Sequence, residues 1–324
     1  MADKSSIEWT DATWNPVRGC SMAKGSETGG CLNCYAARMA ARNLPEMKSP
    51  TTGKPFARIM DSGPRWTGEV ELIEKALDIP LHWKRPRRVF VNSMSDLFHE
   101  RLSFSAIDQI FTVMVAAPQH TYQILTKRPE RMSEYFSSGQ HDHGHGPRRA
   151  DYHLGQSIWL GVSVENQATA DARIPLLLKT PADKRFVSYE PALGPVDFAS
   201  WLLPRYPDAR PEMREQYAKK WKALHPSIDW IIIGGESGPG ARPFNIEWAR
   251  KTLLQCVSRA ACYVKQLGAH PYGVRHNPEF RVWPHSKEFF RDNSHVSTAL
   301  SDKKGGRIEE WPEDLRVREY PEAA

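Results

Sequence analysis

The feature that most constrains the fold is a regular alternation of short apolar runs with helical segments. The clearest run, 229–234, reads Asp-Trp-Ile-Ile-Ile-Gly. Because it is apolar at successive positions, it is typical of a strand in a parallel sheet that is covered on both faces. The other predicted strands are 88–92, 121–126, 157–161, 185–189 and 261–265, with a weaker one within 9–14.

Helical periodicity occupies the segments between these runs. In 106–117 the apolar residues recur at helical spacing, and we expect Ser105 to be the N-cap. Segments 166–178 and 245–259 each begin with an asparagine in the N-cap position. Six or seven strand–helix repeats favour an α/β fold with a partial (β/α) barrel of six to seven parallel strands.

We expect one elaborated domain without an interdomain linker. Residues 1–267 are predicted to form the α/β barrel, and 268–324 a C-terminal extension packed on it. The polar stretch 137–153 and the charged stretch 204–226 interrupt the alternation and are predicted to be surface insertions. The histidine-rich tract 141–145 lies in the first of these, and its setting is typical of an exposed polar loop.

Composition excludes several classes of protein. The chain has 324 residues, with 44 Lys and Arg against 38 Asp and Glu, which gives a net charge of +6. No apolar run approaches the roughly 20 residues that cross a bilayer, and the first residues lack the apolar segment of a secretory signal. Five cysteines are too few for a disulfide scaffold. We expect a soluble, cytoplasmic protein with no membrane partner.

Polar and ionisable residues follow almost every predicted strand. In a parallel α/β fold the active site lies at the carboxyl ends of the strands, so these residues are candidates for one shared, enzyme-like cleft. In chain order they are Asn92, Ser93 and Asp96, then Lys127 and Arg128, Ser163 and Glu165, Glu190, Gly235 and Glu236, and Lys265.

Three of the five cysteines are clustered in a glycine-rich loop near the N-terminus. Their spacing is Cys20-x10-Cys31-x2-Cys34, and a helix is predicted from about residue 35. A Cys-x2-Cys pair lets two thiolates meet at one metal, and a flexible loop can bring a third. The remaining two, Cys256 and Cys262, fall in a predicted helix and strand and are expected to be buried, inert thiols.

This pattern is compatible with three kinds of site. A zinc site normally has four ligands and would need a distant fourth, such as His82 or His99. A redox Cys-x2-Cys pair would leave Cys20 without a role. A [4Fe–4S] cluster on three thiolates would leave one iron open for a small ligand.

Longer motifs around these residues resemble a known family. They resemble the phage-associated three-Cys-motif proteins of undefined function, which are radical-SAM-like, and the resemblance spans nearly the whole chain. The radical SAM superfamily commonly has Cys-x3-Cys-x2-Cys with an aromatic residue before the last cysteine. Here the first gap is ten residues, Asn33 precedes Cys34 and Tyr35 follows it. The matching motifs are 14–20, 31–36, 94–98, 125–129, 234–238 and 311–321.

The resemblance implies an iron–sulfur enzyme that uses S-adenosyl-L-methionine (SAM). A [4Fe–4S] cluster on Cys20, Cys31 and Cys34 would bind SAM and cleave it to a 5′-deoxyadenosyl radical that abstracts hydrogen from a substrate. An electron donor such as flavodoxin or ferredoxin is then required. The resemblance also implies cofactor-binding roles for Gly234, Gly235, Glu236, Asn92, Ser93 and Glu165, and catalytic roles for Lys127, Tyr189 and Glu190.

Basic residues interleaved with tryptophan indicate a nucleic-acid partner. The run 82–88 reads His-Trp-Lys-Arg-Pro-Arg-Arg, and 219–222 reads Lys-Lys-Trp-Lys. Such sequences combine phosphate contacts with base stacking. However, 82–88 precedes its strand and is expected on the face opposite the catalytic ends. Phage association favours DNA over RNA.

Three functional hypotheses follow from the sequence. The first is a radical SAM enzyme that modifies or repairs a nucleic acid. The alternative is a non-catalytic nucleic-acid-binding protein with a structural metal at the three cysteines. A third is a metal-dependent hydrolase that uses the strand-end carboxylates of Asp96, Glu165, Glu190 and Glu236.

Overall fold

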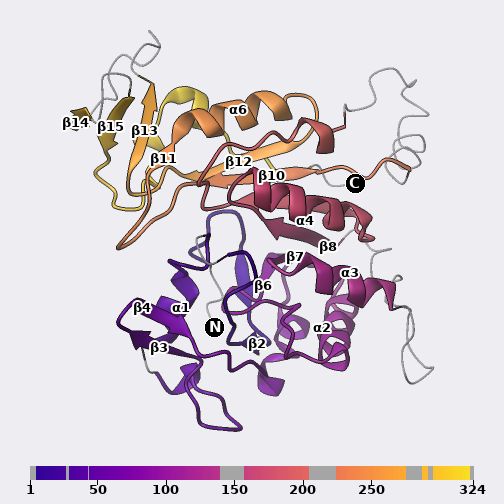
Figure 1. Ribbon diagram of the computed structural model, residues 1–324. Helices are drawn as coiled ribbons and strands as arrows, with labels where there is room; N and C mark the ends of the chain where they lie inside the picture. The colour runs from indigo at the N-terminus through magenta and orange to yellow at the C-terminus, as the bar shows by residue number, and fades with distance from the viewer. Residues whose placement is uncertain are drawn as a thin grey trace. The chain divides into compact units, whose positions relative to one another are not determined.

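Residues 5–26, 29–42, 44–138, 157–203, 224–274, 287–290 and 295–321 are described by the structure, a computed structural model (Figure 1). Most of the two predicted insertions, 137–153 and 204–226, lies outside the described residues, as does the tract 141–145. The chain divides into two compact units. The first comprises Met1–Ser163, Pro175–Lys184 and Ala323–Ala324, and the second comprises Val164–Ile174 and Arg185–Glu322.

Seven strands form one sheet, in the order β1-β6-β7-β8-β9-β10-β12. The β1–β6, β6–β7, β7–β8, β9–β10 and β10–β12 pairs are parallel. The predicted α/β fold with a partial barrel of six to seven parallel strands is therefore confirmed, with all seven strands present. Their bounds are Ala12–Trp14, Arg88–Val91, Thr121–Thr126, Ile158–Ser163, Lys184–Tyr189, Trp230–Gly234 and Ala261–Gln266.

Burial of these strands follows from their continuous apolar sequences. Every residue of β8 is buried in the first unit, and every residue of β10 is buried in the second. Strands that are covered on both faces need apolar residues at both odd and even positions, which is the pattern that predicted them.

Five α-helices lie among the described residues, and their starts largely agree with the sequence. Asn245 Oδ1 accepts a hydrogen bond from Glu247 N at 3.0 Å, and Asn166 Oδ1 accepts one from Thr169 N at 3.0 Å, as predicted for N-caps. The helices are α1 (Tyr35–Ala40), α2 (Phe104–Ala116), α3 (Pro129–Ser137), α4 (Gln167–Lys179) and α6 (Ile246–Cys256).

The prediction of Ser105 as the N-cap of α2 is wrong. Ser103 has the extended backbone of an N-cap residue, and its Oγ accepts a hydrogen bond from Ala106 N at 3.2 Å. The helix therefore begins at Phe104, whose ring packs edge-on against Tyr135 with their centroids 5.4 Å apart. The two serines have the same capping propensity, so the sequence alone does not decide between them.

Smaller sheets and single-turn helices accompany the main sheet. In the first unit, β2 (Val17–Arg18) pairs with β5 (Glu71–Leu72), and β3 (Ala57–Met60) pairs with β4 (Gly63–Trp66). The second unit contains a four-stranded sheet in the order β11-β13-β15-β14, with bounds Phe244–Asn245, Pro271–Val274, His295–Ala299 and Lys287–Phe290. The 3-10 helices are η1 (Pro45–Met47), η2 (Glu74–Ala76), η3 (Ile79–His82), η5 (Ala199–Trp201), η8 (Ile308–Glu310) and η9 (Glu313–Leu315).

The C-terminal segment of the second unit runs alongside β12. Val264 N donates to Val317 O at 2.8 Å, and Glu319 N donates to Cys262 O at 2.8 Å. Trp311 is buried, and its indole donates to Gly305 O at 2.9 Å. Within the described part of the chain, no helix combines the length and the apolar character that crossing a membrane requires.

Candidate functional site

The three clustered cysteines lie on one loop of the first unit. Cys20 follows the short strand β2, and Cys34 occupies the N-cap position of α1. Gly19 has φ of +87°, and a Cβ there would lie 2.0 Å from Glu69 O, so only glycine fits directly before Cys20. Cys20, Cys31 and Cys34 are half-buried, and none is in a disulfide.

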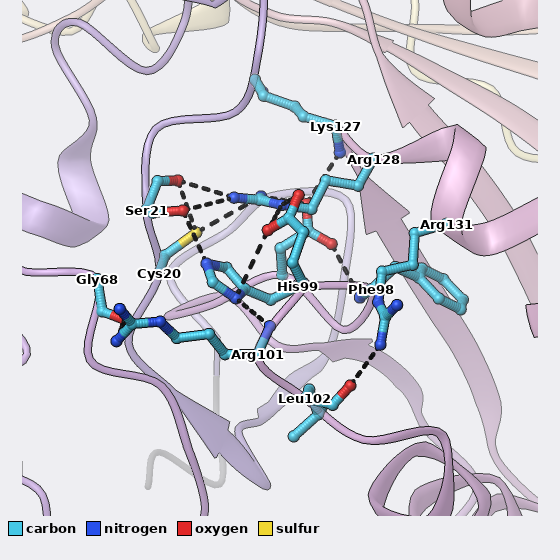
Figure 2. Close-up of polar contacts among 12 residues, drawn as sticks. Cys20, Ser21, Gly68, Phe98, His99, Arg101, Leu102, Lys127, Arg128 and Arg131 are labelled. Carbon is cyan, nitrogen blue, oxygen red and sulfur yellow. Dashed lines mark hydrogen bonds and ion pairs between the residues drawn. The ribbon is translucent and has the colours of Figure 1, made fainter.

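A buried arginine just beyond β7 lies against the first cysteine. Arg128 Nη1 lies 3.8 Å from Cys20 Sγ and 3.2 Å from Asp96 Oδ2. Nη2 donates to the carbonyl and hydroxyl oxygens of Ser21, at 3.1 and 3.0 Å (Figure 2). Nε donates to both carboxylate oxygens of Glu100, at 2.9 and 3.0 Å. All three nitrogens of the guanidinium are engaged, so its orientation is fixed.

Asp96 joins this arginine to the end of the sheet. Its Oδ1 accepts hydrogen bonds from Thr126 Oγ1 at 2.7 Å and from Phe98 N at 3.0 Å. Its Oδ2 accepts from Lys127 N at 3.0 Å and from Arg128 Nη1. Because each oxygen already accepts two hydrogen bonds, the carboxylate acts as a structural anchor for Arg128. We call the group formed by Cys20, Ser21, Asp96, His99, Glu100, Thr126 and Arg128 the Arg128 cluster.

The histidines considered as a fourth zinc ligand are both engaged elsewhere. Arg101 N donates to His99 Nδ1 at 3.1 Å, so the proton of a neutral ring is on Nε2, which lies 2.8 Å from Ser21 Oγ. Burial and the nearby Arg128 lower the pKa of His99 to about 4, which keeps the ring neutral. His82 is exposed, and its Nε2 lies 3.1 Å from Asp78 Oδ2. As placed, His99 has both ring nitrogens engaged, and Nε2 of the exposed His82 faces Asp78.

Burial of Cys20 disfavours a bare thiolate. Burial raises the pKa of Cys20 to about 12; Arg128 lowers it, whereas Asp96, Cys34 and Cys31 raise it further. The three thiols are thus close enough to interact electrostatically. No three Cys, His, Asp or Glu side chains within the described ranges are placed to hold a single metal ion. Cys20 therefore keeps its proton at neutral pH until a cation binds beside it.

Asn92 and Ser93, both predicted to bind a cofactor, lie beside the cysteine loop. Asn92 has φ of +64°, and its Oδ1 accepts a hydrogen bond from Val17 N at 3.2 Å, at the start of the segment that leads to Cys20. Ser93 O accepts one from Tyr35 Oη at 2.9 Å, next to Cys34. These two residues therefore hold both ends of the loop against β6. Lys127, predicted to be catalytic, has a half-buried side chain, and its backbone N–H binds Asp96.

The predicted carboxylates of the second unit each have a cationic partner. Glu165 is fully buried, and its Oε2 lies 3.0 Å from Arg173 Nη1, whose side chain is 5% exposed. Arg242 binds both carboxylate oxygens of Glu236, with Nη2 2.7 Å from Oε1 and Nε 2.9 Å from Oε2. Each carboxylate is therefore compensated by its own partner, which argues against a shared set of metal-binding carboxylates in the described residues.

The other predicted residues of the second unit lie at the ends of β9, β10 and β12. Glu190 Oε2 is 3.1 Å from Lys265 Nζ, and a Cβ added at Gly234 would lie 2.7 Å from Glu190 Oε1. Gly235 packs against the backbone of Leu267, where a Cβ would lie 2.4 Å from the carbonyl oxygen. Tyr189 is buried, and its hydroxyl donates to the carbonyl oxygen of residue 194. Burial raises the pKa of Tyr189 above its usual range.

Sequence reasoning missed the central place of Arg128 and the contributions of Ser21 and His99. The sequence places Arg128 among the cations that follow predicted strands, but it does not indicate the contact of Arg128 with Cys20. Ser21 and His99 are 78 residues apart, so their hydrogen bond has no local signature. The available signal was the Thr-Lys-Arg-Pro sequence at 126–129, directly at the end of a predicted strand. Cys256 and Cys262 are buried, as expected.

Comparison with known proteins identifies a family. A family model described as "Protein of unknown function (DUF5131)" matches residues 4–307. The chain belongs to this family. Searches of the curated proteins and of the solved structures found no match. The part matched by the DUF5131 model includes the cysteine loop, the Arg128 cluster and all seven strands of the main sheet.

Proposed function

We propose that this DUF5131 protein is a radical SAM-type iron–sulfur enzyme that modifies or repairs a nucleic acid, DNA rather than RNA. The proposal takes the chain to be a radical-SAM-like, phage-associated, cytoplasmic member of its family. The observation that carries it is the set of three half-buried thiols on one loop, the first of which, Cys20, lies beside Arg128 at the carboxyl end of β7. The imidazoles of His82 and His99 are engaged elsewhere, so a three-thiol donor set is favoured.

The donor set fits a cluster better than a single ion. A structural zinc ion normally has four protein ligands, so a site with three thiols is one ligand short. A [4Fe–4S] cluster held by three thiolates instead leaves one iron open for a small ligand. The three half-buried cysteines of the loop, Cys20, Cys31 and Cys34, are the number of thiols that such a cluster needs.

The chain's own residues would hold and compensate the cluster. Cys20, Cys31 and Cys34 would be its ligands, and when bound it supplies the electron for reductive cleavage of SAM. Arg128 places a fixed positive charge beside Cys20 and offsets part of the negative charge of the thiolates. Cys20 loses its proton when the cluster binds, because its pKa is about 12 without one.

The remaining assignments are part of the same proposal. Asn92 and Ser93 support the loop from β6 and contribute to the SAM site. Gly234, Gly235 and Glu236, together with Glu165, would bind SAM, and Lys127, Tyr189 and Glu190 would act on the substrate. A flavodoxin or ferredoxin would supply the electron.

Anaerobic purification and reconstitution with iron and sulfide test the proposal. We expect about four irons and four sulfides per chain and conversion of SAM to 5′-deoxyadenosine. Cys20→Ala, Cys31→Ala and Cys34→Ala should lose the iron and keep the fold, whereas Cys256→Ala, the matched control, should keep both. A colourless protein with stoichiometric zinc, or unfolding of the Cys31→Ala variant, would instead support a structural metal site.

The alternative, a non-catalytic nucleic-acid-binding protein, rests on the basic run 82–88. There the ring of Trp83 is already covered by Arg87, whose guanidinium carbon lies 4.9 Å from the ring centroid, and it contacts His120 edge-on. A base would have to displace Arg87 in order to stack on Trp83. This contact makes the run a weaker base-stacking surface than its sequence indicates.

A further inference from the structure

The β3–β4 hairpin carries two apolar side chains at its exposed tip. Ile59 is 75% exposed and Met60 is 56% exposed, and the strands are joined through the residues 61–62. Gly63 follows with φ of +93°, which allows the chain to reverse tightly. The tip thus presents two large apolar side chains to the solvent at the end of a narrow projection.

Cations on the same hairpin are placed where they repel each other. Arg58 and Arg65 are direct cross-strand partners, so their side chains leave the same face of the hairpin. Like charges in this position destabilise a sheet, and an anion between or beside them would relieve the repulsion. Arg58 and Lys54 are both exposed, and Asp61 is the single acidic residue of segment 54–66.

The hairpin is fixed to the cysteine loop. Arg65 Nη1 donates to Leu32 O at 3.0 Å, and Leu32 lies between the two cysteines of the Cys-x2-Cys pair. Helix α1, which begins directly after Cys34, packs on both β3 and β4 (Figure 1). A ligand that the tip engages is therefore held at a fixed position relative to the cysteines.

We propose that the hairpin is a wedge that opens a DNA duplex. The tip enters the base stack with Ile59 on one face of the hairpin and Met60 on the other, and Arg58 contacts a flanking phosphate. Apolar side chains that separate base steps, supported by nearby cations, are a known means of unstacking a duplex, and enzymes that act on a base must first take it out of the stack. The inference rests on the nucleic-acid substrate of the proposed function and adds the means of reaching the base.

A duplex suits this surface better than a protein partner does. A stable protein interface buries about 800 Å² on each side, built around a cluster of apolar residues. The hairpin instead presents Ile59 and Met60 on a narrow tip, next to the exposed Arg58, whose charge complements phosphate. This is the shape and charge that a single base step between two phosphate backbones accommodates.

The experiment uses the full-length chain and a DNA duplex with a central 2-aminopurine, whose fluorescence rises when it is unstacked. We expect the wild-type chain to raise the fluorescence and the double variant Ile59→Ser/Met60→Ser to lose that rise and bind about tenfold more weakly. Leu254→Ser, at a 74% exposed position of α6, is the matched control and should behave as wild type. Arg58→Gln should lower the salt dependence of binding by about one counterion.

An unchanged fluorescence rise in the double variant would overturn the wedge. The wedge is also overturned if the double variant opens DNA normally but flavodoxin reduces its cluster more slowly. The hairpin would then be a docking surface for a protein. The assay needs neither cluster nor SAM. If the wild-type chain raises 2-aminopurine fluorescence but does not cleave SAM, the radical chemistry alone is contradicted. If it cleaves SAM but does not raise the fluorescence, the wedge alone is contradicted.

Discussion

The guanidinium of Arg128 contacts Cys20 Sγ at 3.8 Å through the same nitrogen that contacts Asp96 Oδ2 at 3.2 Å. The end of β7, the Asp96 loop and the first cysteine are therefore connected through one group. Since Asp96 also accepts hydrogen bonds from Thr126 and from Lys127 N, the position of Arg128 depends on the backbone of the sheet.

Replacing Arg128 should destabilise the fold even where the charge is kept. Arg128→Lys cannot reach Asp96, Glu100 and Ser21 at once, because an ammonium lacks the planar fork of a guanidinium. We expect the free energy of unfolding to fall by about 3 kcal/mol, as when a buried ion pair loses a partner. Urea denaturation of the metal-free chain measures it.

The exposed pair Arg88–Asp11 supplies the control for this experiment. Their side chains are 33% and 45% exposed, and the ion pair measures 2.8 Å. Arg88→Lys should change the free energy of unfolding by less than about 1 kcal/mol. Equal effects of Arg88→Lys and Arg128→Lys would show that burial of Arg128 has no energetic consequence.

His99 should make stability depend on pH in the acid range. Its pKa is about 4 in the folded chain, chiefly through burial and then through Arg128, and 6.5 is its ordinary value. As pH falls through 6.5 the unfolded chain takes up a proton and the folded chain does not, so stability is lost between pH 6.5 and about 4. The loss from about pH 7 to about pH 5 is about 2 kcal/mol.

Comparison with His99→Gln isolates this contribution. The glutamine amide keeps a donor for Ser21 but does not titrate. The urea midpoint of the variant should therefore fall less than that of the wild type between about pH 7 and about pH 5. Parallel pH dependence in the two chains would mean that carboxylates, rather than His99, govern acid unfolding.

The strands could be predicted because an uninterrupted apolar run, such as 229–234, is a local sequence signal of a buried strand. The polar strand ends were found for the same reason. The β3–β4 hairpin was missed because Pro64 lies inside β4, and proline argues against a strand unless the strand lies at an edge. Each ion pair at the strand ends, such as Glu236 with Arg242, forms when a loop folds back toward the strand. A local sequence pattern does not indicate which residues the loop brings together.

Gly234 and Gly235 are adjacent, and the sequence predicts a cofactor-binding role for both, but their surroundings in the structure differ. Gly235→Ala places a Cβ 2.4 Å from Leu267 O, and neither backbone can move without disturbing β10 and β12. Gly234→Ala meets only the Glu190 carboxylate, at 2.7 Å, which can rotate away. We expect Gly235→Ala to lower the thermal midpoint by about 4 °C and Gly234→Ala by less than half of that. Equal shifts would contradict the packing described for Gly235.

Glu165 allows a direct test of whether a predicted cofactor-binding residue is structural. Glu165 and Arg173 are 3.0 Å apart, with side chains 0% and 5% exposed. Glu165→Gln removes the carboxylate that lies beside the buried Arg173 guanidinium, so the free energy of unfolding should fall by about 3 kcal/mol. In the double variant Glu165→Gln/Arg173→Met most of that loss should be recovered, because both charges of the buried pair are then removed.

Both variants should then be titrated with SAM by calorimetry, after reconstitution of the cluster. If Glu165 binds the cofactor, the stable double variant still binds SAM at least about tenfold more weakly than wild type, because the lost contact is not restored by repairing the fold. If its role is only to neutralise Arg173, SAM affinity returns together with stability. The second result would remove Glu165 from the proposed cofactor site and leave the three cysteines and Arg128 unaffected.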